Sequence, residues 1–382
     1  MVYAMFSIGI LGFLVWSCFY QFNLTELIGM VALLYCEVQV INIAVYWNSS
    51  TLVSTFDSKN LISYTQSAGN RLSYTTSSSE TTRDTSFFNF SFFRITLSKF
   101  GYNQPITDQW LTWFIGFVEG DGAILCNGGR PRFVLTQKEG TILKHIQSVL
   151  GFGTVRHFPS GDYHRFIVQD IKHIFILCTL FNGNLVLPHR VSQLTKWIEV
   201  LNNKLILGQA KPDTDSSIYN VYSILPFITT PIKPTLQDAW ISGFTDAEGC
   251  FNVNITKRTE TISGYRVQLR FLLDQNNGYD VLIHIRDLFG FGKVTLRRET
   301  INVYRYTINS FLGLGEVVNY FTIFPLKTKK EISFTNWCKV YNMVVNKQHL
   351  TEEGLLEVRS IVKTINLTNS VTKKIGSAKP KK

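Results

Sequence analysis

The chain of 382 residues lacks the signatures of several common protein classes. Its six cysteines form no C-x-x-C pair and no cluster with histidine, which argues against a zinc site or disulfide scaffold and predicts free thiols. No strand–GxxxxGKS/T–helix segment exists, and the start lacks the basic region and small-residue cleavage site of a secretory signal. The hydrophobic share of 45% excludes a disordered or collagen-like chain, and the length allows two or three domains.

Charge is sparse, at 17% of residues, and it is distributed unevenly. Residues 1–105 hold five basic and five acidic side chains, so the whole net charge of +11 lies in the remainder of the chain. A basic region behind a neutral leader predicts a polyanionic partner, and nucleic acid is the commonest one.

The first 47 residues are apolar and form a leader. Residues 1–16 are short for a membrane span, which needs about 20 residues. The second apolar run, 27–47, carries Glu37, which costs roughly 3 kcal/mol on insertion scales. Alone, these runs would indicate weak membrane attachment. However, MVYAMFSIGILGFLVWS resembles a transmembrane stretch of cytochrome c oxidase subunit 1 up to Ser17, which implies an exon read in frame into an intron. Membrane association of the leader stays open.

Residues 48–104 are predicted to be a Ser/Thr-rich linker. Runs such as SYTTSSSETTRDTS cannot bury enough apolar surface to offset the entropy of ordering. The aromatic stretch Phe87–Phe93 is expected to form a strand or a staple against the following domain, which should begin near 103–107.

Residues 105–382 contain two copies of one unit. The matched segments are WLTWFIGFVEGDG (110–122) with WISGFTDAEG (240–249), RFVLTQ (132–137) with RFLLDQ (270–275), LGFGTVR (150–156) with FGFGKVTLR (289–297), YHRFIV (163–168) with VYRYTI (303–308), and LVLPHR to KW (185–197) with PLKTKK to NW (325–337). Their preserved order indicates a duplication with a pseudo-twofold axis. We assign 105–225 to the first unit and 226–382, with a basic C-terminal tail, to the second.

Each unit is predicted as αββαββα: a helix ending in an acidic turn, a hairpin, a helix, a second hairpin and a closing helix. The strands alternate with period two, and one face carries Asn, Gln, Thr and Arg without carboxylates, whereas an ordinary solvated sheet face favours Lys, Glu and Thr. Arg, Gln and Asn are the residues that read base edges in the major groove. The predicted DNA-binding residues are Arg132, Asn252, Asn254, Arg266, Gln268 and Arg270.

The two apolar helices end in matched acidic motifs, FIGFVEGDG and ISGFTDAEG. Gly116 and Gly243 lack side chains, so the helices can approach closely at the pseudo-twofold axis. Asp121 and Glu248 would then lie side by side at two helix C-termini, where each other's charge and the helix dipoles repel them. A divalent cation would neutralise that repulsion, and oxygen-only ligands favour Mg²⁺. The alternative is that both acids are ordinary polar residues at helix ends.

These motifs resemble the LAGLIDADG homing endonucleases in their two-motif, single-chain form from organellar introns, over most of 105–350. The resemblance implies an α/β (α+β) fold with a saddle of two antiparallel sheets across double-stranded DNA, and a monomer containing an internal pseudo-dimer. It implies that Asp121 and Glu248 bind the metal, and that Glu119 and Asp246 cap the partner helix and contact backbone amides.

The resemblance also implies glutamines that orient the hydrolytic water, at Gln137 and Gln275, and basic residues near the last helix. The basic candidates are Lys327, Lys329 and Lys330 in the second unit. An offset of 140 pairs the last two with His189 and Arg190, which are also predicted to bind DNA. The register of this basic residue stays open.

The implied activity is metal-dependent double-strand DNA cleavage. The exon-like leader implies an intronless cytochrome c oxidase subunit 1 gene as target, and a mitochondrial location. One alternative is an RNA maturase that binds its host intron RNA and assists splicing. A membrane-associated structural protein is a further alternative, which rests on the leader alone.

Overall fold

A computed structural model describes residues 88–207 and 222–365, and the predicted leader and most of the predicted linker lie outside them. The first unit runs α4 (Asp108–Asp121), β1 (Gly122–Asn127), β2 (Arg130–Gln137), α5 (Gly140–Leu150), β3 (Thr154–Phe158), β4 (Tyr163–Val168), α6 (Ile171–Phe181) and α7 (Pro188–Ile206). The second runs α8 (Trp240–Glu248), β5 (Gly249–Lys257), β6 (Tyr265–Asn276), α9 (Tyr279–Phe289), β7 (Lys293–Leu296), β8 (Val303–Ile308), α10 (Phe311–Ile323), α11 (Lys330–Val345) and α12 (Glu352–Thr364).

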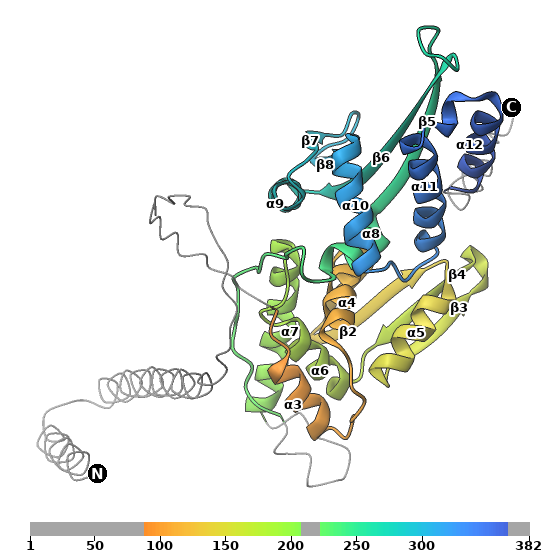
Figure 1. Cartoon of the computed structure of the whole chain (residues 1–382). Helices are drawn as coiled ribbons and strands as arrows, with labels where there is room; N and C mark the ends of the chain where they lie inside the picture. Colours follow the sequence, from red (N-terminus) through yellow and green to blue (C-terminus); the bar gives the residue numbers. More distant parts are fainter. Residues whose placement is uncertain (1–87, 208–221, 366–382) are drawn as a thin grey trace, which may run out of the picture. The chain divides into compact units, whose positions relative to one another are not determined.

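The order of elements confirms the duplicated αββαββα prediction. The strands form two antiparallel sheets with the equivalent orders β1-β2-β4-β3 and β5-β6-β8-β7 (Figure 1). The closing region of each unit is longer than expected, because a second helix follows the predicted closing helix: α7 follows α6, and α11 follows α10. In the second unit, α12 also packs on α11. None of the helices in the described ranges is both long and apolar enough to cross a membrane.

Local sequence signals account for several boundaries. Helix α4 begins after Thr107, whose side chain accepts a hydrogen bond from the Trp110 backbone N–H. The GFG turns end α5 and α9, because Gly151 and Gly290 adopt the left-handed conformation with φ of 76° and 70°. The repeated GFG is therefore a helix terminator in both units.

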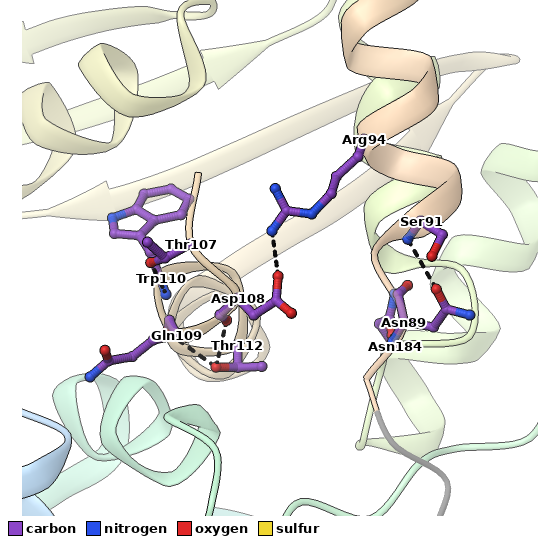
Figure 2. A network of polar contacts seen from close by, with 9 residues as sticks. All are labelled: Asn89, Ser91, Arg94, Thr107, Asp108, Gln109, Trp110, Thr112 and Asn184. Atoms are coloured by element: carbon purple, nitrogen blue, oxygen red, sulfur yellow. Dashed lines mark hydrogen bonds and ion pairs between the residues drawn. The ribbon is translucent and has the colours of Figure 1, made fainter. Parts of the chain in front are cut away.

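A further helix, α3 (Ser91–Lys99), lies within the segment that composition predicts to be linker. Its side chains Phe93 and Leu97 are buried, and α3 packs on α6. Figure 2 shows Arg94 of α3 in an ion pair with Asp108 at the start of α4. Within the described part of the predicted strand or staple, residues 91–93 start a helix rather than a strand, and Phe90 and Phe93 are buried in the core as a staple would be.

Helices α4 and α8 lie side by side at the centre of the duplicated unit (Figure 1). A Cβ atom on Gly116 would come within 2.1 Å of the Trp240 carbonyl oxygen, and one on Gly243 within 1.8 Å of the Trp113 carbonyl oxygen. Any side chain would collide with backbone that cannot move independently. The predicted close approach at Gly116 and Gly243 is confirmed.

We predict that Gly243→Ala destabilises the fold by about 1–3 kcal/mol or more, because the added methyl group must push the two central helices apart. Gly315→Ala in α10 is the matched control, since its Cβ would meet only the Tyr341 hydroxyl at 3.2 Å. That control should be neutral or slightly stabilising. The measurement is urea unfolding of both variants, and equal midpoints would contradict the packing argument.

Candidate active site

The acids Asp121 and Glu248 are the last residues of α4 and α8, and the structure brings them together. A Cβ on Gly120 would lie 2.3 Å from the Ala247 Cβ and 3.2 Å from the Glu248 Cγ, so the two helix ends are in contact. Burial, and then the negative charge of Asp121, raise the pKa of Glu248 to about 7. Burial also raises the pKa of Asp121. The two carboxyl groups thus lie together where the helices end, as the motifs predict, with Glu248 half-buried and Asp121 open to solvent on one side.

Two cationic side chains, Arg190 and Lys330, lie at the helix ends that carry the acids. The Lys330 Nζ donates to the carbonyls of Thr245 at 2.9 Å and Ala247 at 3.3 Å, at the C-terminus of α8. The Arg190 Nε and Nη2 donate to the Glu119 carbonyl at 3.0 and 2.9 Å, at the C-terminus of α4. The offset of 140 therefore pairs Lys330 with Arg190 in structure as well as in sequence.

The role of these cations is electrostatic and local. Each positive charge lowers the pKa of Asp121 and of Glu248, against the effect of burial. Burial in turn lowers the pKa of Lys330, and the nearby acids oppose that shift. Since they also donate to backbone carbonyl oxygens at the two helix ends, they neutralise the negative end of each helix dipole.

The other basic candidates lie elsewhere. Lys329 is exposed, and its backbone N–H donates to the Glu139 carboxylate at 2.9 Å. His189 is exposed beside Arg190. The Lys327 ammonium lies 5.7 Å from the centre of the Trp113 ring. Of the three lysines, only Lys330 points at the helix ends that carry the acids.

The sixth-position acids form crossed contacts between the two units. The buried Glu119 accepts hydrogen bonds from the Trp240 indole at 2.7 Å and from the backbone N–H groups of Val186 and Leu187. Asp246 accepts from the Trp113 indole at 2.8 Å and from the backbone of Lys327 and Thr328. The expected contacts to backbone amides are confirmed.

The expected cap on the partner helix is wrong in detail. The amides that Glu119 and Asp246 bind precede α7 and α11 of the same unit, and the partner helix is reached through an indole N–H. A signal for this existed in the sequence. The motif offset of 127 aligns Trp113 with Trp240, three residues before each motif glycine.

The two glutamines differ sharply in their contacts. The Gln137 Nε2 donates to Asp121 Oδ2 at 2.6 Å, so this amide fixes the carboxylate. Gln275 is 8% exposed, its Nε2 reaches only the Asn276 carbonyl at 3.4 Å, and its Oε1 is buried without a hydrogen-bond partner. Of the two glutamines, only Gln137 forms a hydrogen bond with the acid at the helix end of its own unit.

The predicted DNA-binding residues lie on the outward faces of the sheets. In the second sheet, Asn252 pairs with Arg270 and Asn254 with Gln268 in direct register, and Thr256 pairs with Arg266. The Arg270 guanidinium donates to Asn252 Oδ1 at 3.1 and 2.6 Å. In the first sheet, Arg132 is exposed opposite Leu125.

The idea that this polar face is free of carboxylates needs correction. Asp274 follows Arg270 and Gln268 along the outward face of β6, four residues beyond Arg270, and it accepts hydrogen bonds from Arg305. Its charge also raises the pKa of Glu248.

The donor set fits a hard divalent cation. Asp121 and Glu248 offer carboxylate oxygens, and within 88–207 and 222–365 no three His, Cys, Asp or Glu side chains converge as a metal site. Mg²⁺ is commonly bound by one or two carboxylates, with water and substrate phosphate completing the shell. Two raised pKa values at adjacent carboxyls are what a cation would relieve.

Comparison with known proteins gives consistent likenesses. Residues 241–341 match the LAGLIDADG endonuclease family. "Probable intron-encoded endonuclease 4" of Neurospora crassa is 34% identical over 266 residues, which cover 68% of this chain and 45% of that protein. "Uncharacterized cox1 intron-2 37.2 kDa protein" of Schizosaccharomyces pombe is 26% identical over 348 residues, 87% of this chain and 97% of that protein. The chain thus spans less than half of the first relative.

Solved structures share the fold. The meganuclease I-AabMI bound to uncleaved DNA superposes with a TM-score of 0.53 at 26% identity, covering 67% of this chain and 99% of that one. I-LtrWI bound to target DNA superposes with a TM-score of 0.54 at 22% identity, and the match covers 68% of this chain and 99% of that one. The architecture is that of a duplicated, single-chain meganuclease. The chain therefore resembles the LAGLIDADG endonucleases: residues 241–341 match that family, and the described fold is that of the two-motif, single-chain meganucleases.

We predict that the metal-free protein loses stability as pH rises from about 4.5 to 7. The folded pKa of Glu248, about 7, exceeds its ordinary value of 4.5, so the folded state holds more protons than the unfolded state in this window. Glu248→Gln should flatten this decline by on the order of 1–3 kcal/mol.

Urea unfolding at pH 5 and pH 7.5 without divalent cations measures this decline. Glu357→Gln, an exposed glutamate on α12, is the control and should keep the wild-type slope. Added Mg²⁺ at pH 7.5 should stabilise the wild type more than Glu248→Gln. If the free energy of unfolding declined with pH equally in Glu248→Gln and Glu357→Gln, Glu248 would not be the group responsible.

Proposed function

We propose that this protein is a site-specific endonuclease that cuts both strands of a DNA duplex with the help of divalent cations, Mg²⁺ in particular. The observation that supports the proposal is the contact between the ends of α4 and α8, whose last residues are the acids Asp121 and Glu248. Each acid comes from a different unit. One cluster can therefore serve two strands related by the same pseudo-twofold axis.

The chain's own groups would act as follows. Asp121 and Glu248 would hold the cations, which when bound supply Lewis-acid stabilisation of a scissile phosphate and a more acidic water. Gln137 keeps the Asp121 carboxylate in one orientation through its 2.6 Å hydrogen bond. Arg190 and Lys330 lower the pKa of both acids, which favours the ionised forms that a cation needs.

The sheet faces would bind the duplex. Exposed Arg132 and the cross-strand pair Asn254–Gln268 present donors and acceptors outward at the spacing of neighbouring strands. Arginine and the side-chain amides can form two hydrogen bonds to one base edge, which gives sequence preference. The net charge of +11 would add affinity through phosphates, with a strong dependence on salt.

The DNA target and the cellular location of the protein are inferred from its exon-like start and from a relative. The exon-like start and the relative in a cox1 intron favour an intronless cytochrome c oxidase subunit 1 gene as the target. They favour a mitochondrial location as well. Incubating the full chain and Mg²⁺ with a duplex spanning that exon junction tests the proposal. A maturase without nuclease activity would bind the intron RNA and leave the duplex intact.

We predict that Asp121→Asn reduces cleavage by at least about 10³-fold, because a neutral amide does not attract the cation that Asp121 would share with Glu248. DNA affinity should stay within about threefold, since phosphate and base contacts lie on the sheets. Plasmid cleavage and filter binding measure the two effects. Asp280→Asn, the same change at the exposed start of α9, should alter neither. A parallel loss of binding would make Asp121 a structural residue.

We predict unequal effects of the two glutamines. Gln137→Ala frees the Asp121 carboxylate and should slow one strand cut by on the order of tenfold or more, so nicked plasmid accumulates. Gln275→Ala removes an amide that makes no hydrogen bond to Glu248, so it should have a smaller effect on nicking. Separating supercoiled, nicked and linear plasmid over time measures both. Equal accumulation of nicked plasmid would contradict the asymmetry, provided that both variants unfold at the wild-type temperature.

A further inference from the structure

The outward faces of the two sheets differ in how their arginines are engaged. Strands β1 to β4 contain no Asp or Glu, and four arginines lie on their outward face: Arg130, Arg132, Arg156 and Arg165. Strands β5 to β8 contain a single carboxylate, Asp274. The duplication makes the two faces comparable position by position.

In the second unit, Asp274 lies directly opposite Arg305 across β6 and β8. Its carboxylate accepts from the Arg305 Nε and Nη2, each at 2.6 Å, and from the Arg297 Nη1 at 3.2 Å. This two-pronged ion pair engages the Nε and Nη2 hydrogens of the Arg305 guanidinium, which are then not available to a ligand.

In the first unit, the equivalent pair is Thr136 and Arg165, which are opposite each other across β2 and β4. Threonine supplies no carboxylate, and the Arg165 Nε is buried without a hydrogen-bond partner. The guanidinium carbon lies 5.0 Å from the ring centres of both Phe158 and Tyr163, which stack on each other. Aromatic contact thus holds Arg165 in place without using its hydrogen-bonding capacity.

We propose that Arg165 is a base-reading residue of the first unit, and that Asp274 keeps Arg305 from the same role in the second. The inference rests on the proposed DNA-cleaving function and adds to it a difference in how the two half-sites are read. A guanidinium held in one orientation matches the two acceptors of a guanine in the major groove. Arg156 lies opposite Arg165 on β3 and adds positive charge beside it.

Selection from a randomised duplex library by the full chain, without divalent cations so that no strand is cut, tests this inference. The wild type should select a site with a guanine preference at one position of the half-site bound by the first unit. Arg165→Gln should weaken that preference by on the order of 10- to 100-fold and leave the other half-site unchanged. Arg305→Gln, the matched change in the second unit, should leave both preferences within about twofold, because Asp274 already engages this arginine.

Two exchanges of the opposing residue give an independent test that leaves both arginines in place. Thr136→Asp, at an exposed position, should pair with Arg165 and reduce the guanine preference as Arg165→Gln does. Asp274→Thr should release Arg305 and create a new preference in the second half-site. Thermal unfolding of each variant confirms that it is folded. Arg165→Lys keeps the positive charge but lacks the two-pronged guanidinium, so it should lose the guanine preference too.

Three results would overturn the inference. The first is an unchanged selected site with Arg165→Gln. The second is a uniform loss of affinity without a change in preference, which would make Arg165 a phosphate contact. The third is a loss of base preference with Arg305→Gln as large as the loss with Arg165→Gln. If the wild type selects no duplex at all, the proposed function itself fails, so the two failures are distinguishable.

Discussion

The contact between two helix ends that both carry negative charge is the constraint on which the rest of the site depends. Gly116 and Gly243 allow the backbones of α4 and α8 to touch, and this contact brings Asp121 and Glu248 together at the helix ends. Repulsion between them and with the helix dipoles works against the fold. Arg190 and Lys330 offset part of that repulsion by binding the carbonyls at the same helix ends.

A second set of contacts holds the two units in register. Glu119 and Asp246 each bind the indole N–H of a tryptophan from the other unit, and each also binds amides that lead into the next helix of its own unit. These buried carboxylates are fully surrounded by donors, so an error in helix packing would leave a buried charge unpaired. The crossed pairs therefore specify the relative position of the acids that follow two residues later.

The scaffold is symmetric while its chemistry is not. Gln137 holds Asp121, whereas Gln275 is buried with an unsatisfied oxygen, and an arginine in one unit corresponds to a lysine in the other. Duplication in a single chain permits this divergence, because each copy accumulates its own substitutions. A homodimer of the same unit would carry identical residues at both positions.

Some features of the fold and the site can be predicted from the sequence, and others are set only by the tertiary structure. The repeated motifs determined the duplication, the αββαββα order, the close helix contact and the pairing of Asp121 with Glu248, because period and glycine placement are local properties of the chain. Only the tertiary structure decided that Lys330 rather than Lys329 faces the acids, that Trp113 and Trp240 bind the sixth-position acids, and that Asp274 lies on the polar face. Those outcomes depend on which side chains from distant segments meet, and the direction of a side chain at a helix start or strand end is set by packing rather than by spacing.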